Sequence, residues 1–133
     1  MNQRGFATLE VILMVVIIGI LATVAVPRFT DVTTKANTAK IQSDLTTIDT
    51  AIQMYYMEKG EYPATGDIPN TLKAYLMDIP KPPTGSAYVD GTSKKIDGKT
   101  YLLIDDPNVT TTATLKPQRA SLDGKVAGDF YKN

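Results

Sequence analysis

The chain has 133 residues, with 14 basic and 14 acidic side chains, so its formal net charge is zero. It contains neither cysteine nor histidine, which excludes disulfides, cysteine or histidine metal sites and a Ser-His-Asp hydrolase. The balanced charge also argues against nucleic acid as the main partner, because no basic excess is present to displace phosphate counterions. We expect no catalytic residues, no metal and no cofactor, and therefore not an enzyme.

The first predicted element is a membrane-spanning helix. Residues 6–26 carry a single charged side chain, Glu10. At 1.5 Å per residue, a helix of this length is about 30 Å long and matches the hydrocarbon core of a bilayer. A helix that is apolar on every side needs a large protein around it to be buried. The rest of the chain is too short for that, which favours membrane insertion.

Three interpretations of this segment compete. A cleaved secretory signal would use Arg4 as its basic start and residues 23–25 for cleavage, but the charge of Glu10 nearly cancels that start. A plain one-pass anchor has no use for a carboxylate beside the hydrocarbon, where an acid indicates a function. An interfacial carboxylate in head-group water is the alternative role for Glu10. The third interpretation takes the neighbouring residues together.

The sequence Gly5-Phe6-Ala7-Thr8-Leu9-Glu10, preceded by four polar or terminal residues, resembles the class III signal of type IV pilins and pseudopilins. The resemblance implies that a prepilin peptidase cuts between Gly5 and Phe6 and that the new amine of Phe6 is methylated. Glu10 then becomes the fifth mature residue. Gly19 and Pro27 also fall where the family commonly has glycine and proline. The departure at residues 7–9 is conservative in size.

The chemistry fits these assignments. Glycine at position 5 lets the backbone lie extended in a tight protease site. Cleavage creates an ammonium group at Phe6, and the resemblance implies that Glu10 of a neighbouring copy pairs with it, because an unpaired charge in hydrocarbon costs a few kcal/mol. Between Gly19 and Pro27 lie β-branched residues that form helix weakly. We expect a regular helix in the single subunit and a helix break at Gly19–Pro27 in the filament.

After Pro27 the pattern becomes amphipathic. Apolar residues follow at spacings of 4, 3, 4 and 3, which is typical of one face of a helix. They are Ile41, Leu45, Ile48, Ile52 and Tyr55. We therefore predict one long helix from about Phe6 to Lys59, with Gly60 as its stop. Its apolar face must be covered by the rest of the chain.

The remaining residues predict a loop, a short helix and a small antiparallel sheet. The loop covers 60–69, and a helix over 70–77 would be capped by Asn70. Asp-Gly pairs at 90–91, 97–98 and 123–124 predict tight turns. We expect a central strand over 99–104, a second strand over 109–115, and a sheet of three or four strands on the helix face. Clustered oxygens at Asp105, Asp106 and Asn108 leave a calcium site open, although they lack the spacing of a calcium loop.

The predicted fold class is α+β, with a long N-terminal helix packed on a small antiparallel sheet. Residues 1–5 would be the leader peptide and 6–27 the transmembrane and filament-core helix. Residues 28–59 and 60–133 would together form one globular domain.

The resemblance implies a pilin that polymerises into a type IV pilus or a related filament. The alternative is a pseudopilin of a type II secretion or DNA-uptake (competence) system, and a third possibility is a membrane-anchored binding domain that never polymerises. Implied partners are other copies of the chain, a prepilin peptidase, and an assembly platform with its ATPase. The subunit would first cross the cytoplasmic membrane once, with its N-terminus inside, and then enter an extracellular or periplasmic filament.

Overall fold

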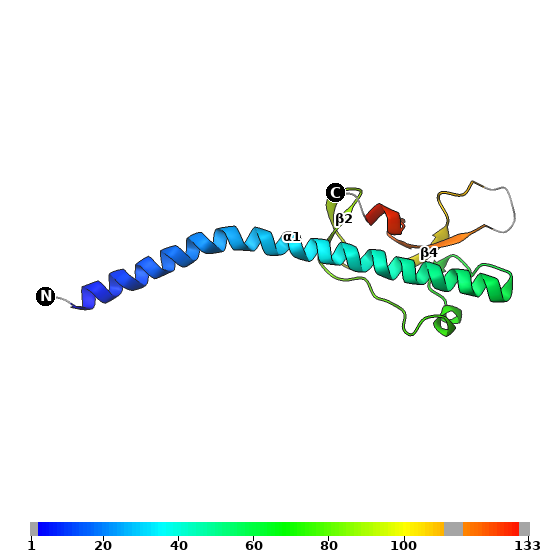
Figure 1. Cartoon of the computed structure of the whole chain (residues 1–133), viewed down its shortest axis with the longest axis horizontal. Coiled ribbons are helices and arrows are strands. Elements are labelled where there is room, and N and C mark those ends of the chain that lie inside the picture. Colours follow the sequence, from blue (N-terminus) through cyan, green and yellow to red (C-terminus); the bar gives the residue numbers. More distant parts are fainter. Residues whose placement is uncertain (1–2, 111–115, 131–133) are drawn as a thin grey trace. The chain divides into compact units, whose positions relative to one another are not determined.

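A computed structural model describes residues 3–110 and 116–130 (Figure 1). The described chain is α+β, with one long helix at its N-terminal end and a small antiparallel sheet packed on part of it, which confirms the predicted fold class. The chain divides into two compact units, Met1–Thr33 and Thr34–Asn133. The helix α1, Gln3–Lys59, contributes residues to both units, and each unit is described by itself below.

Helix α1 begins three residues earlier than predicted and ends where predicted. It continues through Gly19 and Pro27, and its last residue is Lys59. Gly60 follows with a φ of 75°, the left-handed conformation that favours glycine, and its N–H donates to the carbonyl of Tyr56 at 2.8 Å. The glycine stop is therefore confirmed.

The core lies in the second unit, on one face of α1. The buried apolar residues of the helix are Ile41, Leu45, Ile48, Ala51 and Ile52. Tyr55 is half-buried against the same cluster. Residues from the rest of the unit complete this core, namely Leu72, Leu103, Ala120, Leu122 and Phe130. The predicted helical stripe and its cover are both confirmed.

The sheet that covers the helix has three strands in the order β1-β4-β5, all antiparallel. Their bounds are Gly66–Asp67, Tyr101–Asp105 and Gln118–Leu122. The predicted central strand is β4, which confirms its place in the sheet. The sequence did not predict β5. It also did not predict that the strands over Ser86–Val89 and Thr92–Lys95 form a separate sheet.

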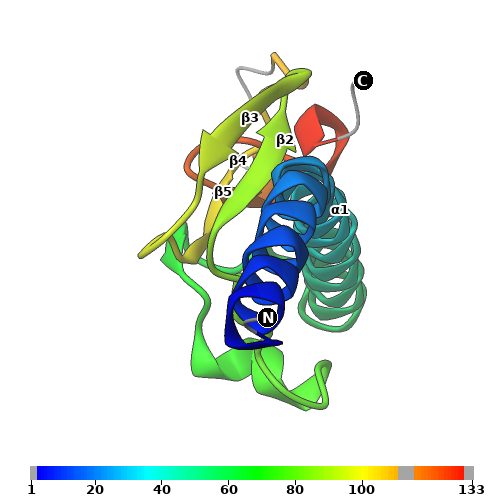
Figure 2. The ribbon, with the colours of Figure 1, turned by 90° about the vertical axis from the view of Figure 1, so that its left-hand side faces the viewer.

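That second sheet is a hairpin of β2, Ser86–Val89, and β3, Thr92–Lys95 (Figure 2). Asp90 and Gly91 join the strands with φ angles of 49° and 75°. Positive φ at both central residues is the geometry of a type I′ turn, whose twist matches that of the two strands. The Asp-Gly prediction is confirmed here.

The other two Asp-Gly pairs differ from each other. Asp123 and Gly124 have φ angles of 54° and 75°, and the flanking Leu122 and Lys125 exchange backbone hydrogen bonds of 2.9 and 3.0 Å, so this pair also makes a tight turn. Gly98 has a φ of 72° but lies in the connection from β3 to β4, which are not paired. The third pair therefore turns the chain between two sheets.

Two local predictions need correction. The predicted helix over 70–77 is a shorter 3₁₀ helix, η1, over Asn70–Ala74, and its cap position is Pro69, with no side-chain capping bond. The carbonyl of Pro69 accepts the N–H of Leu72, so Asn70 is the first residue of the helix and not its cap. The strand predicted over 109–115 falls largely on residues 111–115, outside the described residues, and Val109 is not in a strand. A second 3₁₀ helix, η2, covers Ala127–Phe130.

Candidate assembly site

The three residues of the predicted processing and pairing site lie in the first turns of α1. Gly5, Phe6 and Glu10 are all exposed, and Phe6 keeps 72% of its surface. Because residues four apart share one face of a helix, Phe6 and Glu10 lie about 6 Å apart along the axis. The Glu10 side chain makes no ion pair or hydrogen bond with any other residue that the structure describes. Over residues 3–110 and 116–130, the charge of Glu10 therefore has no partner.

Around Glu10 the helix surface is apolar on every side. None of residues 3–33 is buried, and large apolar side chains from Phe6 to Val26 keep between 49% and 72% of their surface. We call residues 6–26 the exposed apolar segment. The helix that contains it is long and apolar enough to cross a membrane. Such a surface is far larger than the apolar patches of soluble monomers and marks a lipid or protein contact.

Polar groups inside the exposed apolar segment bond within the helix. The Thr8 hydroxyl donates to the carbonyl of Arg4 at 2.8 Å, and the Thr23 hydroxyl donates to the carbonyl of Ile20 at 2.7 Å. These bonds let threonines face an apolar environment without unpaired donors. Pro27 has no N–H, so the carbonyl of Thr23 loses its usual helical donor. Glu10 remains the one ionisable group of the segment.

Nothing around the two glycines of α1, in the part of the chain that the structure describes, requires glycine at their positions. A Cβ atom built on Gly5 or Gly19 would meet no atom within 4 Å, and neither residue has a positive φ. Glycine inside a helix costs about 1 kcal/mol relative to alanine. The fold of the chain alone would therefore be more stable with alanine at both positions.

In the second unit, polar side chains of α1 hold the sheets in place. The Asp49 carboxylate accepts hydrogen bonds from the Arg119 guanidinium at 2.8 and 3.2 Å and from the N–H of Ala120 at 2.7 Å. The hydrogen bond to Asp49 raises the pKa of Arg119 above its usual value. This arrangement joins the C-terminal part of α1 to β5.

The hairpin is joined to α1 by neutral groups. The Asn37 amide donates to the carbonyls of Thr84 and Ser86 at 2.9 and 3.0 Å, and the Thr38 hydroxyl accepts the N–H of Tyr88 at 2.8 Å. These bonds use the outer edge of β2, which would otherwise present unpaired backbone groups. The hairpin therefore has a fixed position at residues 37–38 of the helix.

Two tyrosines bond to carboxylates of α1. The Tyr101 hydroxyl donates to Asp44 at 2.7 Å, and burial together with this bond raises the pKa of Tyr101. The Tyr75 hydroxyl donates to Glu58 at 2.6 Å, which raises the pKa of Tyr75 to about 12 and lowers the pKa of Glu58. Sequence reasoning missed these contacts, because their partners are 17 to 57 residues apart.

The oxygens considered for calcium are engaged in local bonds. The Asp105 carboxylate accepts from the Gln118 amide at 2.7 Å and lies 3.7 Å from the Lys116 ammonium. Asp106 accepts the N–H of Asn108 at 2.9 Å, as aspartate commonly does in turns. Over residues 3–110 and 116–130, no group of three or more acidic side chains converges on a point that could hold a metal ion.

Comparison with known proteins identifies the class. The chain is 32% identical over 102 residues to the type II secretion system core protein G of Klebsiella pneumoniae, a match that covers 65% of this chain and 73% of that protein. It is 39% identical over 64 residues to the protein of the same name in Klebsiella michiganensis, covering 48% of this chain and 45% of that protein.

A third relative is the type IV narrow pilus major component PilA5 of Thermus thermophilus, 41% identical over 51 residues, or 38% of this chain and 44% of that protein. No family model matches the chain, and no solved structure matches it. The identity and coverage of the Klebsiella pneumoniae match, together with the fold, show that the chain belongs to the type IV pilin and pseudopilin family.

Proposed function

We propose that the chain is a structural subunit that polymerises through α1 into a filament of the type IV pilus kind. The observation that carries this proposal is the exposed apolar segment with its single carboxylate, Glu10. The segment is long enough to reside in a bilayer before assembly. In the filament it exchanges lipid for the helices of other copies.

That exchange is nearly neutral in hydrophobic terms, so packing and polar contacts must decide it. Cleavage after Gly5 leaves an ammonium group at Phe6, and Glu10 of a neighbouring copy pairs with it. The pair forms only when the two helices are in one axial register. Pairing therefore both drives assembly and sets the step between subunits.

Two kinds of filament in the family are candidates, a secretion pseudopilus and a surface pilus. The match to the secretion protein of Klebsiella pneumoniae covers 65% of 133 residues, about 86, whereas α1 has only 57, so the similarity extends beyond the helix. The match to the pilus protein of Thermus thermophilus covers 51 residues. A secretion pseudopilus is therefore at least as well supported as a surface pilus. Deletion of the gene discriminates them, because it removes surface filaments in one case and protein secretion in the other.

Processing gives a direct test of the leader assignment. The mature chain is expected to begin at Phe6 with a methylated amine, which mass spectrometry of the purified subunit can detect. Replacement of Gly5 by leucine would leave an uncut chain in the membrane. A mature terminus at Val26 would instead show that the segment is a secretory signal.

The Glu10→Ala variant tests the function itself. Membrane insertion and folding of the second unit should persist, because the core and the polar contacts of the second unit, as far as the structure describes them, do not include Glu10. Loss of one partner from a buried ion pair costs about 3–5 kcal/mol, which is more than about a hundredfold in an assembly equilibrium. Filaments sheared from cells, or secretion in the second branch, should therefore be lost while the membrane pool stays normal.

A matched control for this variant is Glu61→Ala, which removes an exposed carboxylate from the second unit. It should leave assembly unchanged. Abundant normal filaments from Glu10→Ala cells would refute the pairing role and return the plain anchor to contention.

A second structural consequence concerns Gly19 and Pro27. The helix is continuous through both residues in the single subunit. We expect the stretch between them to lose its helical form in the filament, because it contains β-branched residues and already lacks one backbone hydrogen bond at Pro27. A filament map with an unbroken helix through both positions would contradict this.

A further inference from the structure

One apolar side chain of the second unit is fully exposed beside a carboxylate. Met77 follows the buried Leu76 and has a relative exposure of 109%, the highest of the large apolar residues in the described chain. The next residue, Asp78, is exposed as well, and its carboxylate accepts only the N–H of Ile79 at 2.9 Å among the described residues. We call Met77 and Asp78 the knob.

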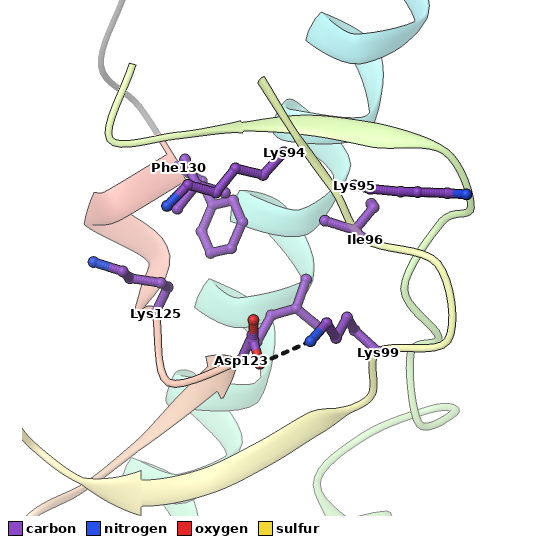
Figure 3. A pocket seen from close by; sticks show the side chains of 9 residues that line it. Lys94, Lys95, Ile96, Lys99, Asp123, Lys125 and Phe130 are labelled. Carbon is purple, nitrogen blue, oxygen red and sulfur yellow. Dashed lines mark hydrogen bonds and ion pairs between the residues drawn. The ribbon is translucent and has the colours of Figure 1, made fainter. Parts of the chain in front are cut away.

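A small pocket of complementary chemistry lies between the hairpin and the end of β5 (Figure 3). Its apolar floor consists of Val89, Ile96, Leu122 and Phe130, all at least 95% buried. Its volume is about 100 Å³. This is well below the roughly 300–1,000 Å³ of a small-molecule or cofactor site. The pocket suits a single side chain.

Four lysines form a basic rim around the pocket, and three of them have a carboxylate partner. Lys99 pairs with Asp123 at 3.0 Å, Lys125 with Asp90 at 2.7 Å, and Lys95 with Asp97 at 3.3 Å. Lys94 has no ion-pair partner among the residues that the structure describes. Figure 3 shows the Lys94 side chain running beside Phe130, whereas Lys95 points away from it. The Lys94 side chain therefore lies next to the apolar floor of the pocket.

The knob and the pocket lie in different parts of the second unit. The chain just before the knob is fixed to α1 near residues 55–58, where the Tyr75 ring is 6.0 Å from that of Tyr55 and the Tyr75 hydroxyl bonds to Glu58. The hairpin beside the pocket is fixed at residues 37–38. These helix positions are about 26–32 Å apart along α1. The hairpin and η1 also lie on opposite sides of the helix (Figures 1 and 2).

We propose that the knob of one copy inserts into the pocket of another copy, with Met77 on the apolar floor and Asp78 beside Lys94. An apolar side chain with an adjacent carboxylate matches, in both size and charge, an apolar pocket whose Lys94 has no ion-pair partner in the described part of the chain. Since the two surfaces differ and cannot meet within one chain, the contact is head-to-tail and repeats from subunit to subunit. This proposal rests on the proposed function, because the contact forms between subunits of the filament.

The chain has no cysteine, so two introduced thiols report this contact without background. We would combine Met77→Cys with Lys99→Cys at the pocket rim and treat intact cells with a short bismaleimide. The matched control combines Met57→Cys with Lys99→Cys, because Met57 is a methionine of 84% exposure outside the knob. The expected result is a ladder of cross-linked oligomers from the first pair and monomer from the control.

Charge reversal sharpens the test. Addition of Asp78→Lys to the first pair should reduce the ladder about two- to fivefold, the effect expected for one exposed ion pair. Further addition of Lys94→Asp should restore it. Absence of a ladder from the first pair, equal ladders from both pairs, or no response to the charge changes would each overturn the proposed contact. Wild-type filament yield or secretion is scored separately, so a failure of the proposed function is distinguishable from a failure of this contact.

Discussion

The two parts of α1 belong to one helix but differ in how their apolar side chains are covered. From Gln3 to Thr33 no residue is buried, whereas from Thr34 to Lys59 six residues are buried under the rest of the unit. In the second part the apolar residues form a stripe, and in the first they surround the helix. The second part therefore finds the cover for its apolar surface within the subunit, whereas the first needs lipid or other copies.

The largest effect that separates the two parts comes from truncating one isoleucine in each. Ile48 is fully buried, and Ile48→Ala should lower the free energy of unfolding of the second unit by about 2–5 kcal/mol through lost burial and a cavity. Ile17 is 49% exposed and contacts no core, so Ile17→Ala should change that free energy by less than about 0.5 kcal/mol.

Tyrosine fluorescence of the full chain in detergent is a suitable readout. The chain has no tryptophan, and its seven tyrosines all lie at residue 55 or beyond, so the signal reports only the second unit. Equal destabilisation by the two variants would mean that the first part of the helix also packs on the core.

A smaller effect is expected from the bond between α1 and β5. Asp49→Ala removes the acceptor of Arg119 and of the Ala120 N–H. Hydrogen bonds to charged groups contribute about 1.5–3 kcal/mol, and we expect the lower end because the Arg119 side chain remains 32% exposed. Denaturant unfolding gives the value. The surface variant Asp105→Ala should cost less, and an equal loss would show that the Asp49 contacts have no special weight.

The smallest effect is a pH dependence confined to the second unit. The pKa of Tyr101 and that of Tyr75 are both raised above the unfolded value of about 10, so the neutral phenols stabilise the fold below pH 10. This stability should decline as the pH rises above 10, where the unfolded chain ionises first. Tyr101→Phe should flatten the decline. Phenolate absorbance follows the titration, and helix content of residues 3–33, which include no tyrosine, should stay constant through it.

Contiguous signals predicted most of the architecture. The end of α1, its buried stripe and the Asp90-Gly91 turn each depend on neighbouring residues or on helical spacing, and all three are confirmed. Strand β5 was missed because its sequence, Gln-Arg-Ala-Ser-Leu, has neither alternation nor β-branched residues. It is held by Asp49, a contact across 70 residues that no local pattern contains.

The candidate site shows the same difference between local sequence signals and contacts of residues far apart in the chain. Gly5, Phe6 and Glu10 could be chosen from sequence because they form one short motif. The knob and its pocket could not, since the pocket combines residues from β2, β3, β5 and η2. The separation of the hairpin from the main sheet, which forms that pocket, was likewise not visible in the turn signals.

In the proposed filament, the exposed apolar segment packs against other copies in a register set by Glu10. An electron cryomicroscopy map of the assembled filament tests it most directly. We expect the Phe6 amine of each subunit to lie within ion-pair distance of Glu10 from a neighbouring copy, with residues 6–26 enclosed by other helices. A map in which Glu10 faces water, or in which residues 6–26 remain uncovered, would contradict it.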